Sequence, residues 1–147
     1  MEAEEVSRRM QRFETVCREH GLPITTQRRV LIRALLQTNR HPSAEELWSA
    51  AQQELPDISR TTVYRVLDTF VDLGLAIRVP HPGSPARFDG NVEPHHHIAC
   101  LRCRRVYDAF DPHCEAMPRP NDAPPGFRIE GCAVLYTGTC RECLRRN

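Results

Sequence analysis

One stretch decides how this chain folds: His95-His96-His97-Ile98-Ala99-Cys100-Leu101-Arg102-Cys103. Its two cysteines are separated by two residues, and a second pair with the same spacing lies near the C-terminus. Four thiolates are the ligand set of a structural zinc ion, and this spacing lets one tight turn direct both sulfurs of a pair at the ion. The sequence therefore predicts a structural Zn(II) site with the ligands Cys100, Cys103, Cys140 and Cys143. The alternative is four buried or disulfide-linked cysteines, which a reducing compartment disfavours.

The three histidines are not needed by a zinc ion that already has four sulfur ligands. If this segment forms a strand, His95 and His97 share one face and His96 points to the other. Two imidazoles on one face of a strand can supply two ligands to a second metal ion. A solvated polar loop after Pro94 explains the same residues, and the histidines alone do not separate the two interpretations.

The composition describes an ordinary globular chain of 147 residues, 40% hydrophobic and 27% charged, which is enough for one domain or two small ones. No apolar run approaches the ~20 residues of a membrane span. The acidic start, Met1-Glu2-Ala3-Glu4-Glu5, does not resemble a secretory signal. We therefore expect a cytoplasmic protein, in which the seven cysteines are metal ligands more often than disulfides.

The basic residues are all arginine, 20 in number, and the net charge is only +1. This balance gives no overall argument for nucleic-acid binding. Two local segments carry arginine without any acid, residues 24–33 and residues 58–67. Arginine suits bidentate contacts to phosphate and guanine, so any DNA contact is expected at these segments.

The first half of the chain has the pattern of short helices followed by a hairpin. Apolar residues at helical spacing predict a helix that ends at Gly21 and a second helix from Thr26 to about Gln37. Ser43 and Glu46 form the capping box of a third helix. The fourth helix has Ser59 as its N-cap and runs to Phe70. Two short strands follow, Leu75–Val79 and Ala86–Phe88, around a turn rich in proline and glycine.

This order of elements is typical of a winged helix-turn-helix, in which the helix of residues 59–70 enters the major groove of DNA. Its polar face carries residue types that read base edges. An amphipathic helix with a merely solvated polar face has the same pattern, so the alternative stays open from the pattern alone.

The second half of the chain is dominated by strand signals: His95–Cys100, Arg105–Phe110 and Phe127–Tyr136. Between the last two, residues 111–126 contain five prolines, which disfavour a long regular helix. The fold class expected is therefore α+β, with a helical first half and a second half organised by zinc and strands.

Several segments in this order resemble the ferric uptake regulator (Fur) family of metal-dependent bacterial repressors. The resemblance runs from about Phe13 to Cys143. Its most specific parts are Ile24–Arg28, His41–Ala44, Thr61–Leu67, Gly74-Leu75, Arg87–Asp89, His95–Cys103 and Cys140–Cys143. It implies an N-terminal winged helix-turn-helix DNA-binding domain (residues 1–84), a junction (85–94), and a C-terminal α/β dimerisation domain with the structural zinc (95–147).

The resemblance also implies partners and site residues. A homodimer is expected to bind a palindromic operator in double-stranded DNA, with no membrane involved. The DNA contacts are expected from Arg28, Arg60, Thr61, Thr62, Tyr64 and Arg65. The regulatory metal, Fe(II) or Mn(II), is expected on His41, Asp89, His95, His97 and Asp108, a borderline-to-hard ligand set unlike the four sulfurs. Metal binding then selects the DNA-competent arrangement of the two halves.

Asp108 bears on what the protein senses. Members of the iron-responsive branch carry Glu at this position, whereas members of the peroxide-responsive (PerR) branch carry Asp, so this chain resembles the PerR branch here. The resemblance to PerR implies that bound Fe(II) reacts with hydrogen peroxide and that a ligand histidine is oxidised, here His41 or His95, which releases DNA. This is self-inactivating sensing and not enzymatic turnover. A plain iron-, manganese- or zinc-responsive repressor is the alternative.

Some residues depart from the family pattern. Cys132 stands where many members have a histidine of an accessory metal site, and His96 stands where iron-responsive members often have Asp. The accessory site is therefore expected to be absent or altered. The proline-rich segment 111–126 replaces a helix of the usual dimer interface, so we expect pairing through the strand Phe127–Tyr136 to contribute to the dimer.

Two further functions fit parts of the sequence. A metallohydrolase would use the histidines and carboxylates with an open coordination position, but there is no obvious general base or substrate motif. A zinc-stabilised interaction module would have no sensing role. Loss of metal-dependent operator binding on His95→Ala separates a sensor from such a module.

Overall fold

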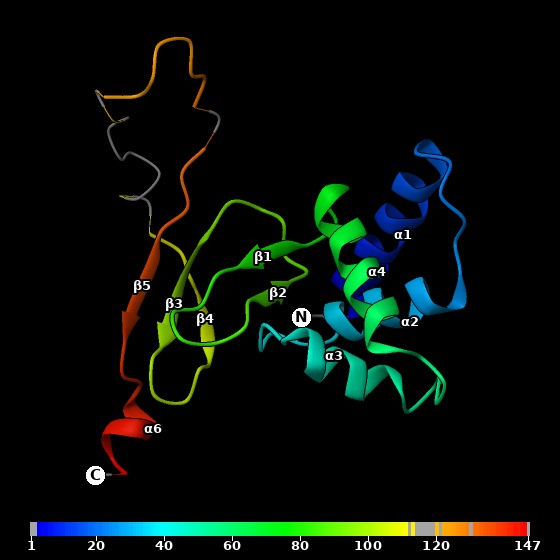
Figure 1. The fold of residues 1–147 in the computed structure, drawn as a ribbon, viewed down its shortest axis with the longest axis horizontal. Helices are drawn as coiled ribbons and strands as arrows, with labels where there is room; N and C mark the ends of the chain where they lie inside the picture. Colours follow the sequence, from blue (N-terminus) through cyan, green and yellow to red (C-terminus); the bar gives the residue numbers. More distant parts are fainter. Residues whose placement is uncertain (1–2, 112, 114–119, 121, 130, 147) are drawn as a thin grey trace. The chain divides into compact units, whose positions relative to one another are not determined.

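The structure is a computed structural model that describes residues 3–111, 113, 120, 122–129 and 131–146. It divides into two compact units, Met1–Glu93 and Pro94–Asn147. The first is built mainly from helices and the second mainly from strands (Figure 1). Within the described residues, no helix is long and apolar enough to cross a membrane.

The first unit contains four helices: α1 (Ala3–Glu19), α2 (Thr26–Leu36), α3 (Ala44–Ala51) and α4 (Arg60–Asp72). Three of them begin at hydroxyl N-caps, because a side-chain oxygen satisfies a backbone N–H that has no partner within the helix. The caps are Thr25, Ser43 and Ser59. At α3 the capping box expected from the sequence is complete, since Ser43 N also donates to Glu46 Oε2 at 2.6 Å.

A short antiparallel hairpin completes this unit, with β1 (Ile77–Val79) paired to β2 (Arg87–Asp89). Gly74 lies between α4 and this hairpin. Its φ is 62°, a left-handed conformation that glycine adopts without a steric penalty. Helices followed by a hairpin are the winged helix-turn-helix expected from the sequence, with α3 and α4 as its helix pair and β1–β2 as its wing.

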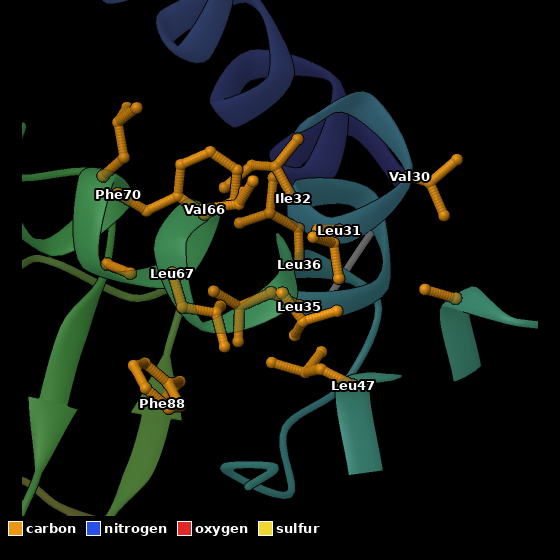
Figure 2. Packing of buried hydrophobic residues seen from close by; sticks show 14 of the residues in the cluster. Val30, Leu31, Ile32, Leu35, Leu36, Leu47, Val66, Leu67, Phe70 and Phe88 are labelled. Atoms are coloured by element: carbon orange, nitrogen blue, oxygen red, sulfur yellow. The ribbon is translucent and has the colours of Figure 1, made fainter. Parts of the chain in front are cut away.

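The core of this unit lies between α1, α2, α3 and α4 (Figure 2). Its largest fully buried side chains include Phe13 and Phe70, whose rings meet edge to face at 5.9 Å. Phe88 of β2 belongs to the same cluster. The hairpin is therefore attached to the helices by apolar packing, which fixes the position of Asp89, the next residue of β2.

The second unit is organised by a three-stranded sheet in the order β4-β3-β5, from β3 (His96–Cys100), β4 (Val106–Ala109) and β5 (Leu135–Gly138). β3 pairs with β4 in antiparallel and with β5 in parallel register. The short helix α6 (Arg141–Leu144) follows β5 after two residues. The first Cys-x-x-Cys segment thus begins at the last residue of β3, and the second begins two residues after the end of β5, the neighbouring strand of the same sheet.

The strand expected at Phe127–Tyr136 is wrong in its bounds, because β5 comprises only Leu135–Gly138. The register with β3 explains the difference. His97 pairs with Leu135, and its N–H donates to Val134 O. Residues before Val134 would therefore have to pair with residues that precede β3, and there Pro94 has no backbone N–H to donate. Half of the proline-rich segment 111–126 lies outside the described residues.

Candidate functional site

The four cysteines of the two Cys-x-x-Cys segments meet in the second unit, as the spacing predicted. Each offers a sulfur atom, and these four atoms all lie within 4.8 Å of one another. Cys100 Sγ lies 4.0 Å from Cys143 Sγ, and Cys103 Sγ lies 3.7 Å from Cys140 Sγ. Sulfurs bound tetrahedrally to zinc at ~2.3 Å are roughly 3.8 Å apart, so this cluster has the dimensions of a zinc site. The sequence alternative of disulfides does not apply, since all four cysteines are free.

Two tight turns present these sulfurs. In the first, Arg104 N donates to Cys100 O at 2.9 Å, with Arg104 in a left-handed conformation at φ 63°. In the second, Cys140 is the N-cap of α6, and Leu144 N donates to its carbonyl at 3.0 Å. A side chain is strained in the left-handed region, so the turn at Arg104 needs support from the rest of the site.

The thiols of this cluster have displaced pKa values. Burial raises the pKa of Cys100, but backbone N–H donors at Cys103, Cys140 and Arg102 outweigh it and lower the pKa to about 6. Burial, followed by hydrogen bonds to neighbouring thiols, raises the pKa of Cys143 to about 12. Burial also raises the pKa of Cys103. Cys100 is therefore mostly thiolate at neutral pH, and zinc has to displace protons from Cys103 and Cys143.

In the first unit, a histidine and a carboxylate lie side by side. His41 Nε2 is 3.4 Å from Asp89 Oδ2, and both residues are buried. Donor atoms that share one ion at ~2.1 Å are roughly 3.0–3.4 Å apart, so this pair has the spacing of two ligands to one metal. The backbone brings them together, because Phe88 N donates to Pro42 O at 2.9 Å.

Both members of this pair are held by their surroundings. His41 has a φ of 48°, in the left-handed region, where a residue other than glycine is uncommon and often serves a function. Asp89 Oδ1 accepts the N–H of Asn91 at 2.7 Å, which leaves Oδ2 directed at His41. Asn91 Oδ1 in turn accepts from Arg9 at 2.8 Å. Such second contacts orient metal-binding carboxylates.

The second unit contributes a separate group of three donors. His95 Nε2 lies 3.4 Å from Asp108 Oδ1, and the rings of His95 and His97 have their centroids 4.5 Å apart. His97 and Asp108 are directly opposed in the β3–β4 register. The donor atoms of these three residues all lie within 4.8 Å of one another. His95 and His97 therefore share a face, as the strand alternation predicted.

His96 and Phe110 complete the surroundings of this group. His96 is buried, and its Nδ1 accepts the N–H of Val134 at 3.3 Å, so it connects β3 to the chain before β5. Phe110 stacks on His95 with ring centroids 5.6 Å apart and an angle of 25° between the planes. Cys132, proposed above to replace an accessory histidine, is exposed.

Three of the expected DNA-contacting residues, Thr61, Tyr64 and Arg65, are exposed on α4. Thr62 is used within the helix cap, since its hydroxyl lies 2.9 Å from Ser59 Oγ.

The two remaining arginines of that set are engaged within the first unit. Arg60 Nε donates to Glu45 at 2.7 Å, and its guanidinium lies 3.8 Å from the centre of the Trp48 ring. Arg28 donates to Pro23 O at 2.5 Å. A DNA phosphate that binds Arg60 therefore competes with Glu45.

Sequence reasoning missed the supporting residues Arg9, Asn91 and Phe110. Arg9 contacts a segment more than 80 residues away in the chain, and no local pattern indicates that pairing. Phe110 is the last residue of the strand predicted at Arg105–Phe110. This pattern predicted its position in the chain but not its contact with His95.

Comparison with known proteins extends these findings. The model of the "Ferric uptake regulator family" matches residues 19–137. A peroxide-responsive repressor PerR of Staphylococcus aureus (strain Mu50) is 29% identical over 143 residues, which cover 97% of each chain.

Two solved structures are similar in fold. The ferric uptake regulator of Helicobacter pylori has a TM-score of 0.77 at 23% identity and covers 95% of this chain and 93% of its own. A zinc-bound manganese uptake regulator has a TM-score of 0.67 at 30% identity and covers 86% and 97%.

Proposed function

We propose that this chain, which belongs to the ferric uptake regulator family, is a repressor in which one regulatory metal ion senses hydrogen peroxide. Proteins of this family are transcription regulators and not enzymes, and this chain is a metal-responsive DNA-binding regulator with a four-cysteine zinc site. The identity of the second metal, the signal and the assembly are the parts proposed here.

The regulatory ion is proposed to bind His41, Asp89, His95, His97 and Asp108. The first unit offers two of these donors and the second offers three, and each set has the spacing of ligands to one ion. Three imidazoles with two carboxylates suit Fe(II) or Mn(II) better than a soft-ligand metal. An ion that uses both sets favours one arrangement of the two units, which is how metal binding would raise affinity for the operator.

The observation that carries the peroxide proposal is the short carboxylate of Asp108, 3.4 Å from His95 Nε2. It is supported by the similarity to PerR over 97% of the chain. Iron would supply one-electron chemistry with peroxide. In the net reaction the O–O bond of one peroxide breaks, one oxygen atom replaces a ring hydrogen of His41 or His95 as a hydroxyl, and one water leaves. The imidazole loses two electrons and the peroxide gains them.

The alternative is a repressor that responds to metal without oxidation. It is supported by the 30% identity to a zinc-bound manganese uptake regulator. The experiment that separates the two treats the Fe(II)-loaded protein with dilute peroxide and measures intact mass and operator binding. One added oxygen on a peptide that contains His41 or His95, with loss of DNA binding, supports peroxide sensing. Loss of iron without added oxygen supports the plain metal sensor. The Mn(II)-loaded protein is the control.

For DNA recognition, we propose that a cytoplasmic homodimer binds a palindromic operator through two copies of α4. Thr61, Tyr64 and Arg65 are exposed there and suit base and phosphate contacts, with Arg28, Arg60 and Thr62 in supporting positions. The working division is a DNA-binding domain (1–84), a junction (85–94) and a dimerisation domain (95–147).

A further inference from the structure

The geometry points to Phe110 as a second site of peroxide-driven modification: its ring is hydroxylated in competition with the histidine ligands. This inference rests on the proposed function, because it needs a metal on the donor group of the second unit and hydrogen peroxide as the oxidant. It makes Phe110 a residue that determines how much oxidant each sensing event requires.

The position of Phe110 carries the inference. Its ring stacks on the imidazole of His95 with centroids 5.6 Å apart and planes within 25° of parallel. The Nε2 edge of that imidazole is directed at the donor group, since His95 Nε2 lies 3.4 Å from Asp108 Oδ1. A reactive oxygen species released between His95 and Asp108 therefore has the Phe110 ring in the layer immediately next to His95.

Exposure adds a second argument. Phe110 is 72% exposed, whereas the side chain of His95 has no exposed surface. One face of the Phe110 ring covers His95, and most of the remaining ring is open to solvent. An oxidant that forms at the donor group and escapes along this side meets the aromatic ring before it reaches bulk solvent.

The chemistry balances with peroxide alone as the oxidant. One C–H bond of the ring is replaced by a C–O bond, which converts phenylalanine into a tyrosine isomer. The O–O bond of one hydrogen peroxide breaks, one of its oxygens becomes the ring hydroxyl, and the other leaves as water with the displaced ring hydrogen. The ring loses two electrons and the peroxide accepts them. The donor residues stay intact, so a protomer modified at Phe110 keeps its ligands and its DNA binding.

Phe127 provides an internal control. It belongs to the same unit and is 65% exposed, similar to Phe110, but the structure records its ring in no stacking contact with His95. Trypsin cuts after arginine except before proline, so both rings fall on one peptide, residues 106–128. An oxidant that diffuses in bulk solution modifies both rings, whereas an oxidant produced at the donor group modifies Phe110 selectively.

The experiment uses the full chain with its zinc, loaded with Fe(II), and peroxide labelled with heavy oxygen. Fragment spectra of three peptides locate the label: residues 41–60, 88–102 and 106–128. Because Cys114 and Met117 lie on the third peptide and also take up oxygen, the background variant is C114S/M117L. The Zn(II)-loaded protein, which has no accessible redox change, is the matched control. The variant Phe110→Leu keeps the apolar bulk and removes the aromatic ring.

We expect labelled oxygen on Phe110 at least severalfold above Phe127, only in the iron form, together with label on His41 or His95. Phe110→Leu should raise the histidine label severalfold at a fixed dose of peroxide. Label on the histidines with none on Phe110, or equal label on Phe110 and Phe127, overturns this inference and leaves peroxide sensing intact. Absence of label from all three peptides contradicts peroxide sensing itself.

Discussion

The four-cysteine zinc site of this protein and the regulatory metal site that we propose are built in opposite ways. The four sulfurs all belong to the second unit and are presented by two turns that directly follow neighbouring strands. The histidine and carboxylate donors are divided, two in the first unit and three in the second. A closed set of ligands within one unit stabilises that unit, whereas a divided set links metal binding to the arrangement of the two units. We propose that this difference separates a structural metal from a regulatory one.

The largest effect is expected from Cys100→Ser. Cys100 is central to the sulfur cluster, because its sulfur accepts the backbone N–H of Cys140 at 3.3 Å as well as that of Cys103. Structural zinc contributes ~10–16 kcal/mol in small zinc domains, so loss of one ligand should cost the bound zinc and the ordered fold of the second unit. Metal analysis and thermal unfolding measure this. Cys132→Ser, at an exposed cysteine outside the cluster, should keep both zinc and stability.

Acidification should remove zinc steeply. Cys143, with a pKa of about 12, and Cys103, whose pKa is also raised, carry protons at pH 7 that zinc must displace. Cys100, with a pKa of about 6, is already mostly thiolate there and binds a proton only below that value. Zinc affinity therefore rises with pH. Below pH 6, where Cys100 also binds a proton, the affinity should fall by about a further factor of ten for each pH unit. Competition with a coloured chelator gives the slope, and an unchanged slope across pH 6 contradicts the assignment.

His95→Ala should separate the two metal groups. Mutation of a residue that only orients a metal ligand lowers metal affinity by ~10–100-fold. Because His95 is itself a proposed ligand, we expect a larger loss of Mn(II) affinity, with the zinc content unchanged. Operator binding at moderate Mn(II) should fall in parallel. His113→Ala, at an exposed histidine of the same unit, is the control. Normal Mn(II)-dependent operator binding in His95→Ala would reduce the protein to a zinc-stabilised interaction module.

Arg65→Ala tests the surface that the divided group is proposed to control. Arg65 is exposed on α4, and we expect its loss to weaken operator binding by ~1–3 kcal/mol without changing either metal. Fluorescence anisotropy with operator DNA at fixed salt measures the change. Arg145→Ala, at an exposed arginine of the second unit, should bind like the parent protein. Equal losses in the two variants would mean that the contact is a general charge effect.

The smallest effect is expected from Ser43→Ala. Ser43 completes the capping box of α3 two residues after His41, and removal of such a cap costs ~1 kcal/mol. Chemical denaturation should show this loss in the first unit with zinc binding unaffected. Ser49→Ala, at an exposed position within the same helix, is the control. A loss of zinc in Ser43→Ala would contradict the independence of the two groups.

Local signals explain which parts of this fold were predictable from sequence. The hydroxyl caps at Ser43 and Ser59 and the alternation of His95 and His97 depend on residues close together in the chain, and the structure confirms them. The four-cysteine cluster was predictable because each Cys-x-x-Cys pair is itself a local signal, although the two pairs lie far apart in the chain. The bounds of β5 were wrong because they depend on a pairing register with β3 and on Pro94, which lie far from it in sequence.

The supporting contacts of the divided group depend on still longer connections. Arg9 reaches Asn91, and Asn91 orients Asp89, through hydrogen bonds between the two ends of the first unit. The left-handed backbone of His41 is likewise a property of the folded turn, since histidine has no strong preference for it. Spacing indicated only His95 and His97 as ligands of a second metal. The full ligand set came from the family resemblance, because His41 and Asp89 lie in the other unit, far from these histidines in the chain.

The most direct test of one ion held from both units is a crystal structure of the Mn(II)-loaded protein, with the ion located by its anomalous scattering. We expect a single manganese ion bonded to His41 and Asp89 as well as to His95, His97 and Asp108, distinct from the zinc on the four sulfurs. A manganese ion whose protein ligands all come from residues 94–147, with His41 and Asp89 not bound to it, would show that the ion does not link the two units.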